Sequence, residues 1–164
     1  MKKYELTDET IEVYGTALHR IKALKDFGNV KKGEPGGYVE SEHNLSQEGD
    51  CWVFGNAWVY DNARVYGNAE VYDNARVFGN AEVCGNTEVC GNADYITIKG
   101  LGSKYRNTTI FRTKENIAVK CGCFYGTLAE FVDKVKETHG NSKFAKEYFA
   151  LIDLVKIHFE LEDK

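Results

Sequence analysis

Residues 53–94 repeat one six-residue pattern seven times: VFGNAW (53–58), VYDNAR (59–64), VYGNAE (65–70), VYDNAR (71–76), VFGNAE (77–82), VCGNTE (83–88) and VCGNAD (89–94). Each hexad begins with valine and carries asparagine at its fourth position. Alanine follows the asparagine in every hexad but one, where Thr87 replaces it. So strict a period predicts a repeat architecture in which each unit stacks on its neighbours.

Each hexad divides into a short strand and a corner. In Ala57-Trp58-Val59-Tyr60, small or aliphatic residues alternate with aromatic ones, which is the period-2 pattern of a strand with one buried face. We therefore expect Ala57 and Val59 to point inward, and Trp58 and Tyr60 to point outward. The Asp-Asn or Gly-Asn pair that follows tolerates the left-handed backbone that a sharp corner requires. Three such corners close a triangle, so one coil takes about 18 residues and its strands stack in parallel about 4.8 Å apart.

The pattern resembles the hexapeptide-repeat, left-handed β-helix family, in which an aliphatic residue leads each hexad and a small residue stands two positions before it. The left-handed winding is implied by this resemblance. Two weaker hexads, 41–46 and 47–52, precede the strict run. In them we expect Asn44 and Asp50 at corners, and Leu45 and Cys51 at inward positions. The nine hexads predict about three coils.

The flanks of the repeat predict two further parts, so the chain is expected to be mainly β. Residues 1–40 are predicted to form an N-terminal β cap, because the open end of a solenoid exposes unpaired strand edges. The β-helix is predicted over 41–98, and a C-terminal α+β unit over 99–164. The glycine-rich residues 33–37 are expected to turn into the helix, and 99–104 to form a flexible exit from it.

The C-terminal unit is predicted to contain a hairpin and two helices. Residues 108–113 and 117–121 alternate as hairpin strands do. Thr127-Leu128-Ala129-Glu130 is a capping box that opens a helix to about residue 138, and Gly140 is expected to end it. A second helix is expected to start at Asn141 or Ser142.

The whole chain resembles a group of proteins of phages, prophages and their bacterial hosts. In these proteins a hexapeptide stretch precedes a tail like GLGSKYRNTTIFRT, VKCGCFYGTLAEF and ETHGN, as found here from residue 100 on. The resemblance implies a phage setting, but no mechanism.

Aromatic side chains on the outward face of the repeat, among them Trp58, Tyr60 and Phe78, are more numerous than solvent exposure explains. One interpretation is cross-strand stacking that stiffens the sheet. The other is burial against another subunit or against the tail. We predict a homotrimer with these three residues in its interface, which agrees with the trimers common in the resembled family.

Two kinds of chemistry find little support in the sequence. Some members of the resembled family transfer acyl groups with a histidine on a loop that interrupts the coils, but residues 47–94 contain neither a loop nor a histidine. Cys121, Cys123 and His139 provide three soft ligands, but a fourth is missing and the C-x-C spacing is atypical of zinc sites. Buried structural cysteines are commoner. We therefore predict no catalytic residues, no metal and no cofactor.

Residues 99–120 are basic within a chain of net charge −4. A solvated basic face is one interpretation. The other is a site for a small anionic nucleotide-like ligand, in which arginine forks grip phosphate and aromatic rings stack on the base. The candidate ligand-binding residues are Ser103, Lys104, Tyr105, Arg106, Arg112 and Phe124.

The remaining composition favours a cytoplasmic protein. The five cysteines are an odd number without a signal segment, which argues against a disulfide framework. No apolar run approaches the roughly 20 residues that span a membrane. The mild negative charge gives no argument for nucleic acid.

The sequence predicts a non-catalytic homotrimeric binding protein that, in a phage setting, sequesters a nucleotide-derived immune signal of the host at subunit interfaces. A rigid scaffold is the alternative, and an acyltransferase-like enzyme comes third.

Overall fold

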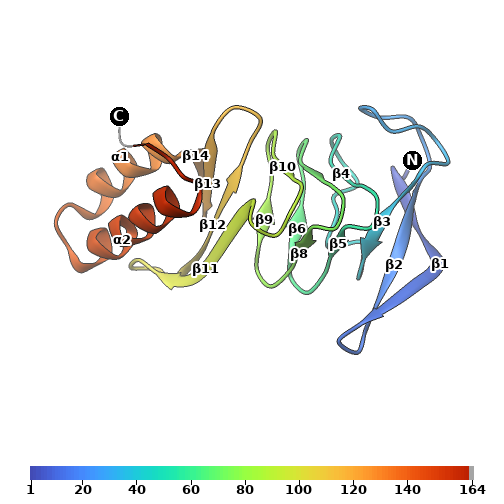
Figure 1. Cartoon of the computed structure of the whole chain (residues 1–164), viewed down its shortest axis with the longest axis horizontal. Helices are drawn as coiled ribbons and strands as arrows, with labels where there is room; N and C mark the ends of the chain where they lie inside the picture. Colours follow the sequence, from blue (N-terminus) through green and yellow to red (C-terminus); the bar gives the residue numbers. More distant parts are fainter. Residues whose placement is uncertain (163–164) are drawn as a thin grey trace. The chain divides into compact units, whose positions relative to one another are not determined.

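The computed structural model describes residues 1–162 and divides the chain into two compact units, Met1–Asp94 and Tyr95–Lys164. The first unit contains only strands, turns and loops, whereas the second combines a four-stranded antiparallel sheet with two helices (Figure 1). The chain is thus mainly β with a C-terminal α+β region, as predicted. The division falls after Asp94 rather than after residue 98, because residues 95–98 belong to the sheet of the second unit.

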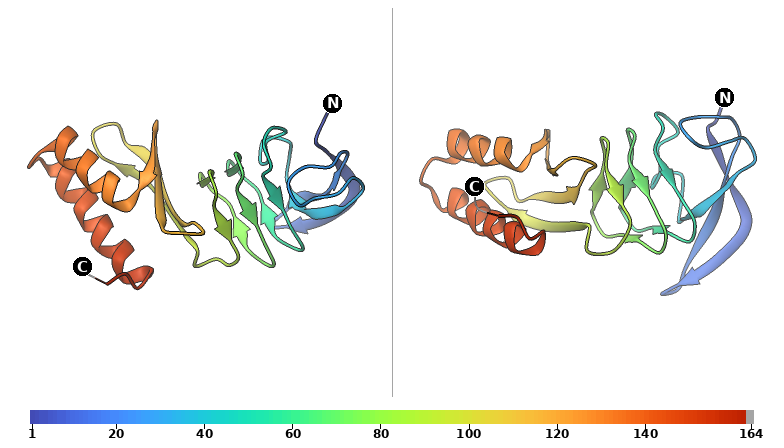
Figure 2. Two further views of the ribbon diagram at one scale, coloured as in Figure 1. Left: turned by 90° about the horizontal axis from the view of Figure 1, so that it is seen from above. Right: turned by 45° about the horizontal axis from the view of Figure 1, so that its top comes forward.

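The hexads form two-residue strands that pair in parallel with the strand 18 residues further on. The resulting ladders are β4-β7-β10, β5-β8 and β6-β9, and Figure 2 shows the strands stacked turn upon turn. Glycine or aspartate takes a positive φ at the corners, for example Asp61 at 57° and Gly67 at 71°. The strands are β4 (Trp52–Val53), β5 (Trp58–Val59), β6 (Arg64–Val65), β7 (Glu70–Val71), β8 (Arg76–Val77), β9 (Glu82–Val83) and β10 (Glu88–Val89).

The interior of these turns contains the residues that the alternation predicted. Every alanine and valine at an inward position of the seven hexads is at most 1% exposed, except Ala93 in the last hexad, which is exposed. Thr87, which replaces one alanine, is also buried, and its hydroxyl donates to the carbonyl of Cys84. The predicted inward positions of the strict repeat are therefore confirmed up to Val89, and Ala93 at the end of the repeat is the exception.

The first turn departs from the 18-residue period, although Leu45 and Cys51 are both buried there as predicted. Val39 pairs with Val59 and Leu45 with Val65, a spacing of 20 residues, whereas Val53 and Val71 are 18 apart. Leu45 therefore occupies a valine position instead of an alanine position. Two additional residues in the corner between Leu45 and Val53 absorb the difference.

The N-terminal cap consists of the antiparallel strands β1 (Tyr4–Val13) and β2 (Thr16–Ala23), followed by β3 (Pro35–Val39), which pairs with β2 and in parallel with β5. Residues 35–37 are therefore strand, not the predicted turn. Gly37 allows the strand to pack closely, because a Cβ there would lie 2.5 Å from the carbonyl oxygen of Ala57.

The second unit packs two helices on an antiparallel meander. The prediction of a flexible exit at 99–104 is wrong for its first part, because the chain continues as strand to Leu101 and turns at residues 102–105. The capping box of Thr127 and Glu130 is confirmed, Gly140 ends the first helix, and Ser142 caps the second. The elements are β11 (Tyr95–Leu101), β12 (Arg106–Arg112), β13 (Ile117–Cys121), β14 (Phe124–Thr127), α1 (Leu128–His139) and α2 (Lys143–His158).

The core of this unit lies between the sheet and the helices. Ile110 and Val119 from the sheet pack with Phe131 of α1 and with Leu151 and Val155 of α2. None of the helices in residues 1–162 combines the length and the apolar character that crossing a membrane requires.

Candidate functional site

A pocket of about 270 Å³ in the second unit contains four of the six predicted ligand residues: Ser103, Lys104, Arg106 and Phe124. We call it the Arg106 pocket. Its walls come from the turn at 102–105, the start of β12, the turn between β13 and β14, one face of α1, and Tyr148 of α2.

The backbone of the β13–β14 turn makes room for Arg106. Gly122 has a φ of 60°, and a Cβ at this position would lie 2.6 Å from Nη1 of Arg106 and 2.7 Å from its Cδ. The arginine side chain therefore lies against the bare Cα of the glycine. Because any side chain at Gly122 would displace it, the turn helps to hold Arg106 at the pocket.

The charged residues that line the pocket are all basic. Lys104, Arg106 and Lys134 line it together with His139, and no carboxylate is part of the lining. Lys134 forms a 2.8 Å ion pair with Glu137, whose hydrogen bond raises the pKa of the lysine. Within residues 1–162, the guanidinium of Arg106 has no hydrogen bond or ion pair. The pocket thus presents positive charge that the described protein compensates only at Lys134.

Aromatic rings form the inner part of the pocket. Phe131 contacts Phe124 and Tyr148 at centroid distances of 5.4 Å each, and His139 stacks on Tyr148 at 5.6 Å. The Tyr148 hydroxyl donates to the carbonyl of Leu101 at 3.4 Å. Burial raises the pKa of Tyr148, and its contact with Cys121 adds to the shift. The tyrosine therefore stays neutral and does not repel an anion.

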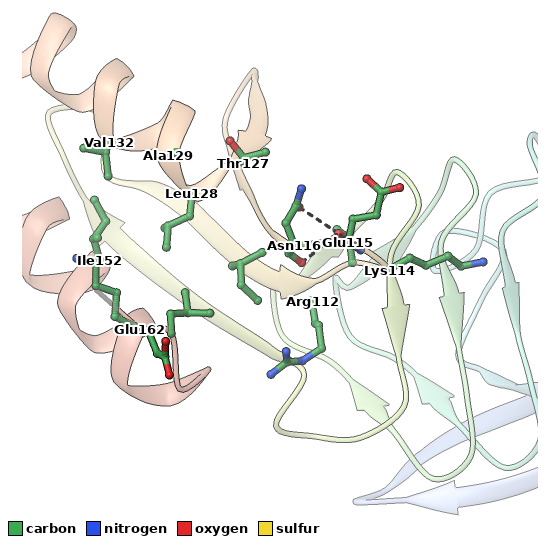
Figure 3. A pocket seen from close by; sticks show the side chains of 14 residues that line it. Arg112, Lys114, Glu115, Asn116, Thr127, Leu128, Ala129, Val132, Ile152 and Glu162 are labelled. Carbon is green, nitrogen blue, oxygen red and sulfur yellow. Dashed lines mark hydrogen bonds between the residues drawn. The ribbon is translucent and has the colours of Figure 1, made fainter. Parts of the chain in front are cut away.

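Arg112 and Tyr105 are not in this pocket. Tyr105 is 68% exposed in the turn before β12 and does not line the cavity. Arg112 ends β12, six residues after Arg106, which corresponds to about 20 Å along a strand. It lines a second pocket of about 780 Å³, shown in Figure 3, which we call the Arg112 pocket.

Eight residues that line the Arg106 pocket were not among the predicted ligand residues, and Lys134, His139 and Tyr148 are three of them. The spacing of Phe131, Lys134, Val135 and Thr138 on one face of α1 is visible in the sequence as an i, i+3, i+4, i+7 pattern. That pattern alone does not show which part of the sheet the face covers.

The three residues considered for a metal site, Cys121, Cys123 and His139, all line the Arg106 pocket. The buried Cys121 sulfur accepts a 3.2 Å hydrogen bond from the hydroxyl of Thr108. Over residues 1–162, however, no three histidine, cysteine or acidic side chains are arranged to hold a metal ion.

The predicted interface residues differ in their surroundings. Tyr60 is buried within its own chain, in a cluster with Val13, Leu18 and Tyr38 that the N-terminal cap provides. Trp58 is half-buried with the Arg76 guanidinium 4.3 Å from its ring centre. Phe78 stacks on Tyr60 at 5.3 Å and remains 46% exposed. Cross-strand stacking therefore occurs in this column, and Phe78 keeps the largest exposed surface.

Comparison with known proteins yields one partial similarity. No protein-family model matches the chain. A curated relative, "Uncharacterized acetyltransferase YdcK" of Escherichia coli (strain K12), is 37% identical over 62 residues, which cover 33% of this chain and 19% of the relative. The chain thus spans less than a fifth of that relative's length. The similarity points to proteins of the hexapeptide-repeat kind.

Proposed function

We propose that this chain is a non-catalytic binding protein whose Arg106 pocket captures a small phosphorylated, nucleotide-like anion. One observation carries the proposal: the guanidinium of Arg106 makes no hydrogen bond or ion pair within residues 1–162, in a pocket lined by cations and by no carboxylate. A planar guanidinium matches two phosphate oxygens at once, and such charge-assisted bonds are about twice as strong as neutral ones.

The size of the pocket limits how much of the ligand it encloses. Its volume of about 270 Å³ lies just below the range of roughly 300–1,000 Å³ that is usual for small-molecule sites. One phosphate with an attached sugar or ring fits this space, whereas a whole dinucleotide would extend beyond it. Lys104 and Ser103 would add contacts to the phosphate, and Phe124 offers an aromatic face to a base.

We further propose that the turns of the first unit wind as a left-handed β-helix and that three chains associate as a homotrimer. The 18-residue spacing of the parallel pairs supports a three-sided coil, and the partial similarity to a relative of the hexapeptide-repeat kind supports its left-handed winding. The exposed surface of Phe78 supports association. In a phage setting, such a trimer would sequester a nucleotide-derived immune signal of the host at its subunit interfaces.

Calorimetry with a panel of cyclic dinucleotides, ADP-ribose-derived signals and mononucleotides tests the binding function. At least one compound should bind the wild-type protein, and Arg106→Ala should weaken that binding by about 1.5–3 kcal/mol, the usual value of a hydrogen bond to a charged group. Arg112→Ala is the matched control, because it removes the same side chain from the other end of β12. Its affinity should stay close to that of the wild type.

Two results would count against the proposal. Binding that survives Arg106→Ala would place the ligand elsewhere. A folded protein that binds no member of the panel would favour the scaffold function, in which the first unit acts as a rigid spacer.

An acyltransferase is the second candidate, because the curated relative carries the name of an acetyltransferase. Acyl transfer at a site in the repeat would need a general base. Residues 47–94 contain no histidine, however, and the nearest one, His43, is exposed. We expect no release of coenzyme A from acetyl-coenzyme A above the uncatalysed rate. A turnover that Arg106→Ala and His43→Ala both leave intact would point to an enzymatic site elsewhere in the chain.

A further inference from the structure

The lysine and arginine side chains that line the Arg106 pocket differ in what neutralises them. Lys134 has its ion pair with Glu137 at 2.8 Å. In the described part of the chain, Lys104 and Arg106 make no ion pair and no side-chain hydrogen bond. Both residues are exposed, so a ligand can reach them from solvent. The pocket therefore offers two positive charges that the described protein does not neutralise.

One carboxylate lies beside the pocket without lining it, and it has its own partners. Glu147 of α2 accepts a hydrogen bond from the backbone N–H of Gly102 at 3.0 Å and lies 3.7 Å from the Lys143 ammonium. Lys143 thus offsets the charge of Glu147, and neither residue lines the pocket. The negative charge of Glu147 therefore does not replace a ligand at the two free cations.

The turn at residues 102–105 brings the two free cations to the same pocket. The backbone N–H of Tyr105 donates to the carbonyl of Gly102 at 3.3 Å and closes the turn. Tyr105 has a φ of 51°, which is unusual for a bulky residue. Its side chain is exposed and does not line the cavity, whereas its neighbours on either side, Lys104 and Arg106, both do. The two cations are therefore held at one site by the backbone of the turn.

The charge of a phosphate group depends on how many of its oxygens are esterified. A terminal monoester carries about 1.5 to 2 negative charges at neutral pH and has three free oxygens. A bridging diester carries a single negative charge and has only two free oxygens. The Arg106 fork can meet two oxygens at once, and the Lys104 ammonium and the Ser103 hydroxyl supply further donors. Only the monoester has the charge and the acceptors to match this set.

We propose that the Arg106 pocket selects a terminal phosphate monoester, as in a nucleoside 5′-monophosphate, over a phosphate diester. The phosphate lies between Lys104 and Arg106, and the sugar or base lies toward the aromatic part of the pocket at Phe124. This inference rests on the proposed function of the pocket and narrows its ligand to one chemical class. Cyclic dinucleotides, whose phosphates are all diesters, are then weaker ligands than mononucleotides.

Calorimetry at pH 8 with matched nucleotides tests the selection, because a phosphate monoester is fully ionised at this pH. The probes are the 5′-monophosphates of adenosine, guanosine, cytidine and uridine, each beside its own 5′-phosphate methyl ester. Each ester keeps the base and the sugar but has one charge and one free oxygen fewer. For every base that binds, the monophosphate should bind at least about tenfold more tightly than its ester, because it makes an additional charge-assisted hydrogen bond.

Lys104→Gln removes one of the two free charges and keeps a polar side chain. It should reduce the preference for the monophosphate by at least about threefold, because the lost charge attracts a dianion more strongly than a monoanion. Lys136→Gln is the matched control, because it makes the same change at an exposed position of α1 that lines neither pocket. Its preference should equal that of the wild type, and circular dichroism confirms that both variants are folded.

Equal affinity for a monophosphate and its methyl ester would overturn the inference, and so would an unchanged preference in Lys104→Gln. Arg106-dependent binding of a cyclic dinucleotide that is tighter than the binding of every monophosphate would also overturn it, but the proposed binding function would stand. A folded protein that binds none of these compounds would overturn both.

Discussion

Replacing the buried Lys3 by methionine should destabilise the first unit by about 3 kcal/mol. Lys3 is 1% exposed, and its ammonium donates to the carbonyls of Cys51 at 2.9 Å, Gly49 at 3.3 Å and Glu48 at 3.4 Å. It also lies 3.2 Å from the Cys51 sulfur and 5.1 Å from the ring centre of Phe27. Lys3 thus supplies donors to backbone carbonyls in and beside the irregular corner of the first turn.

The magnitude follows from what methionine keeps and what it removes. Methionine fills most of the volume of the lysine stem, so little packing is lost. It has no donor, and a buried acceptor left unsatisfied costs about 1–3 kcal/mol. Three carbonyls would give more than 3 kcal/mol, but burial of the ammonium is itself unfavourable and offsets part of that sum. About 3 kcal/mol corresponds to a fall of about 12–24 °C in the melting temperature of a unit of the size of Met1–Asp94.

The chain offers a separate probe for each unit. Its two tryptophans, Trp52 and Trp58, both lie in the first unit, and Trp52 is buried. Both helices lie in the second unit. Tryptophan fluorescence should therefore report the earlier unfolding of Lys3→Met, while helical circular dichroism should change little. Lys2→Met, at an exposed neighbouring position, is the control.

The pH dependence gives the same prediction a second test. Burial lowers the pKa of Lys3 below its ordinary value of 10.5. Between the lowered value and 10.5, the unfolded chain binds more protons than the folded one, so this lysine makes stability rise with pH in that window. Lys3→Met lacks this contribution, and the stability difference from the wild type should grow as the pH rises toward 10.5. A difference below about 0.5 kcal/mol at every pH would refute the reasoning.

Three further predictions concern the core, the assembly and the Arg106 pocket. Val71→Asp should unfold the first unit, as measured by tryptophan fluorescence, because it buries an unpaired carboxylate between the valines of neighbouring turns. Glu70→Lys should fold like the wild type, and equal behaviour of the two variants would contradict the assigned register. Trp58→Ala combined with Phe78→Ala should weaken association by about 2 kcal/mol or more in analytical ultracentrifugation, and a monomeric wild type would contradict the trimer. Gly122→Ala should lower nucleotide affinity by about tenfold without unfolding the helices, because the new Cβ displaces the pocket arginine.

The strict repeat could be predicted from the sequence almost residue by residue, because its period specifies backbone geometry directly. Each Ala and Val position was assigned to the interior from the alternation alone, and each is buried except Ala93, where the repeat ends. The pattern fails where the period changes. Leu45 looks like an alanine-position residue in a hexad counted back from Val53, and only pairing with Val65 reveals the two additional residues in the corner.

Strands whose partners lie outside the repeat were harder to predict. Gly36 and Gly37 have the composition of a turn, yet they form part of β3, because the neighbouring turn leaves no space for a Cβ. Residues 99–101 look flexible in isolation, but β11 is stabilised by pairing with β12. The helix boundaries at Thr127 and Gly140 were predicted well, because capping depends on residues that are close in sequence.

The candidate site shows the same limit. Arg106 and Arg112 are six residues apart, and clustering in the sequence suggested one shared site. In a strand, however, six residues extend about 20 Å, which is farther than one small ligand pocket reaches. Lys134 and His139, about thirty residues further along the chain, lie in the same pocket as Arg106, because α1 packs its last turns near the start of β12. Residues that are close in sequence therefore share a site when they lie in one turn or at one helix end. Residues six positions apart along a strand belong to two separate pockets.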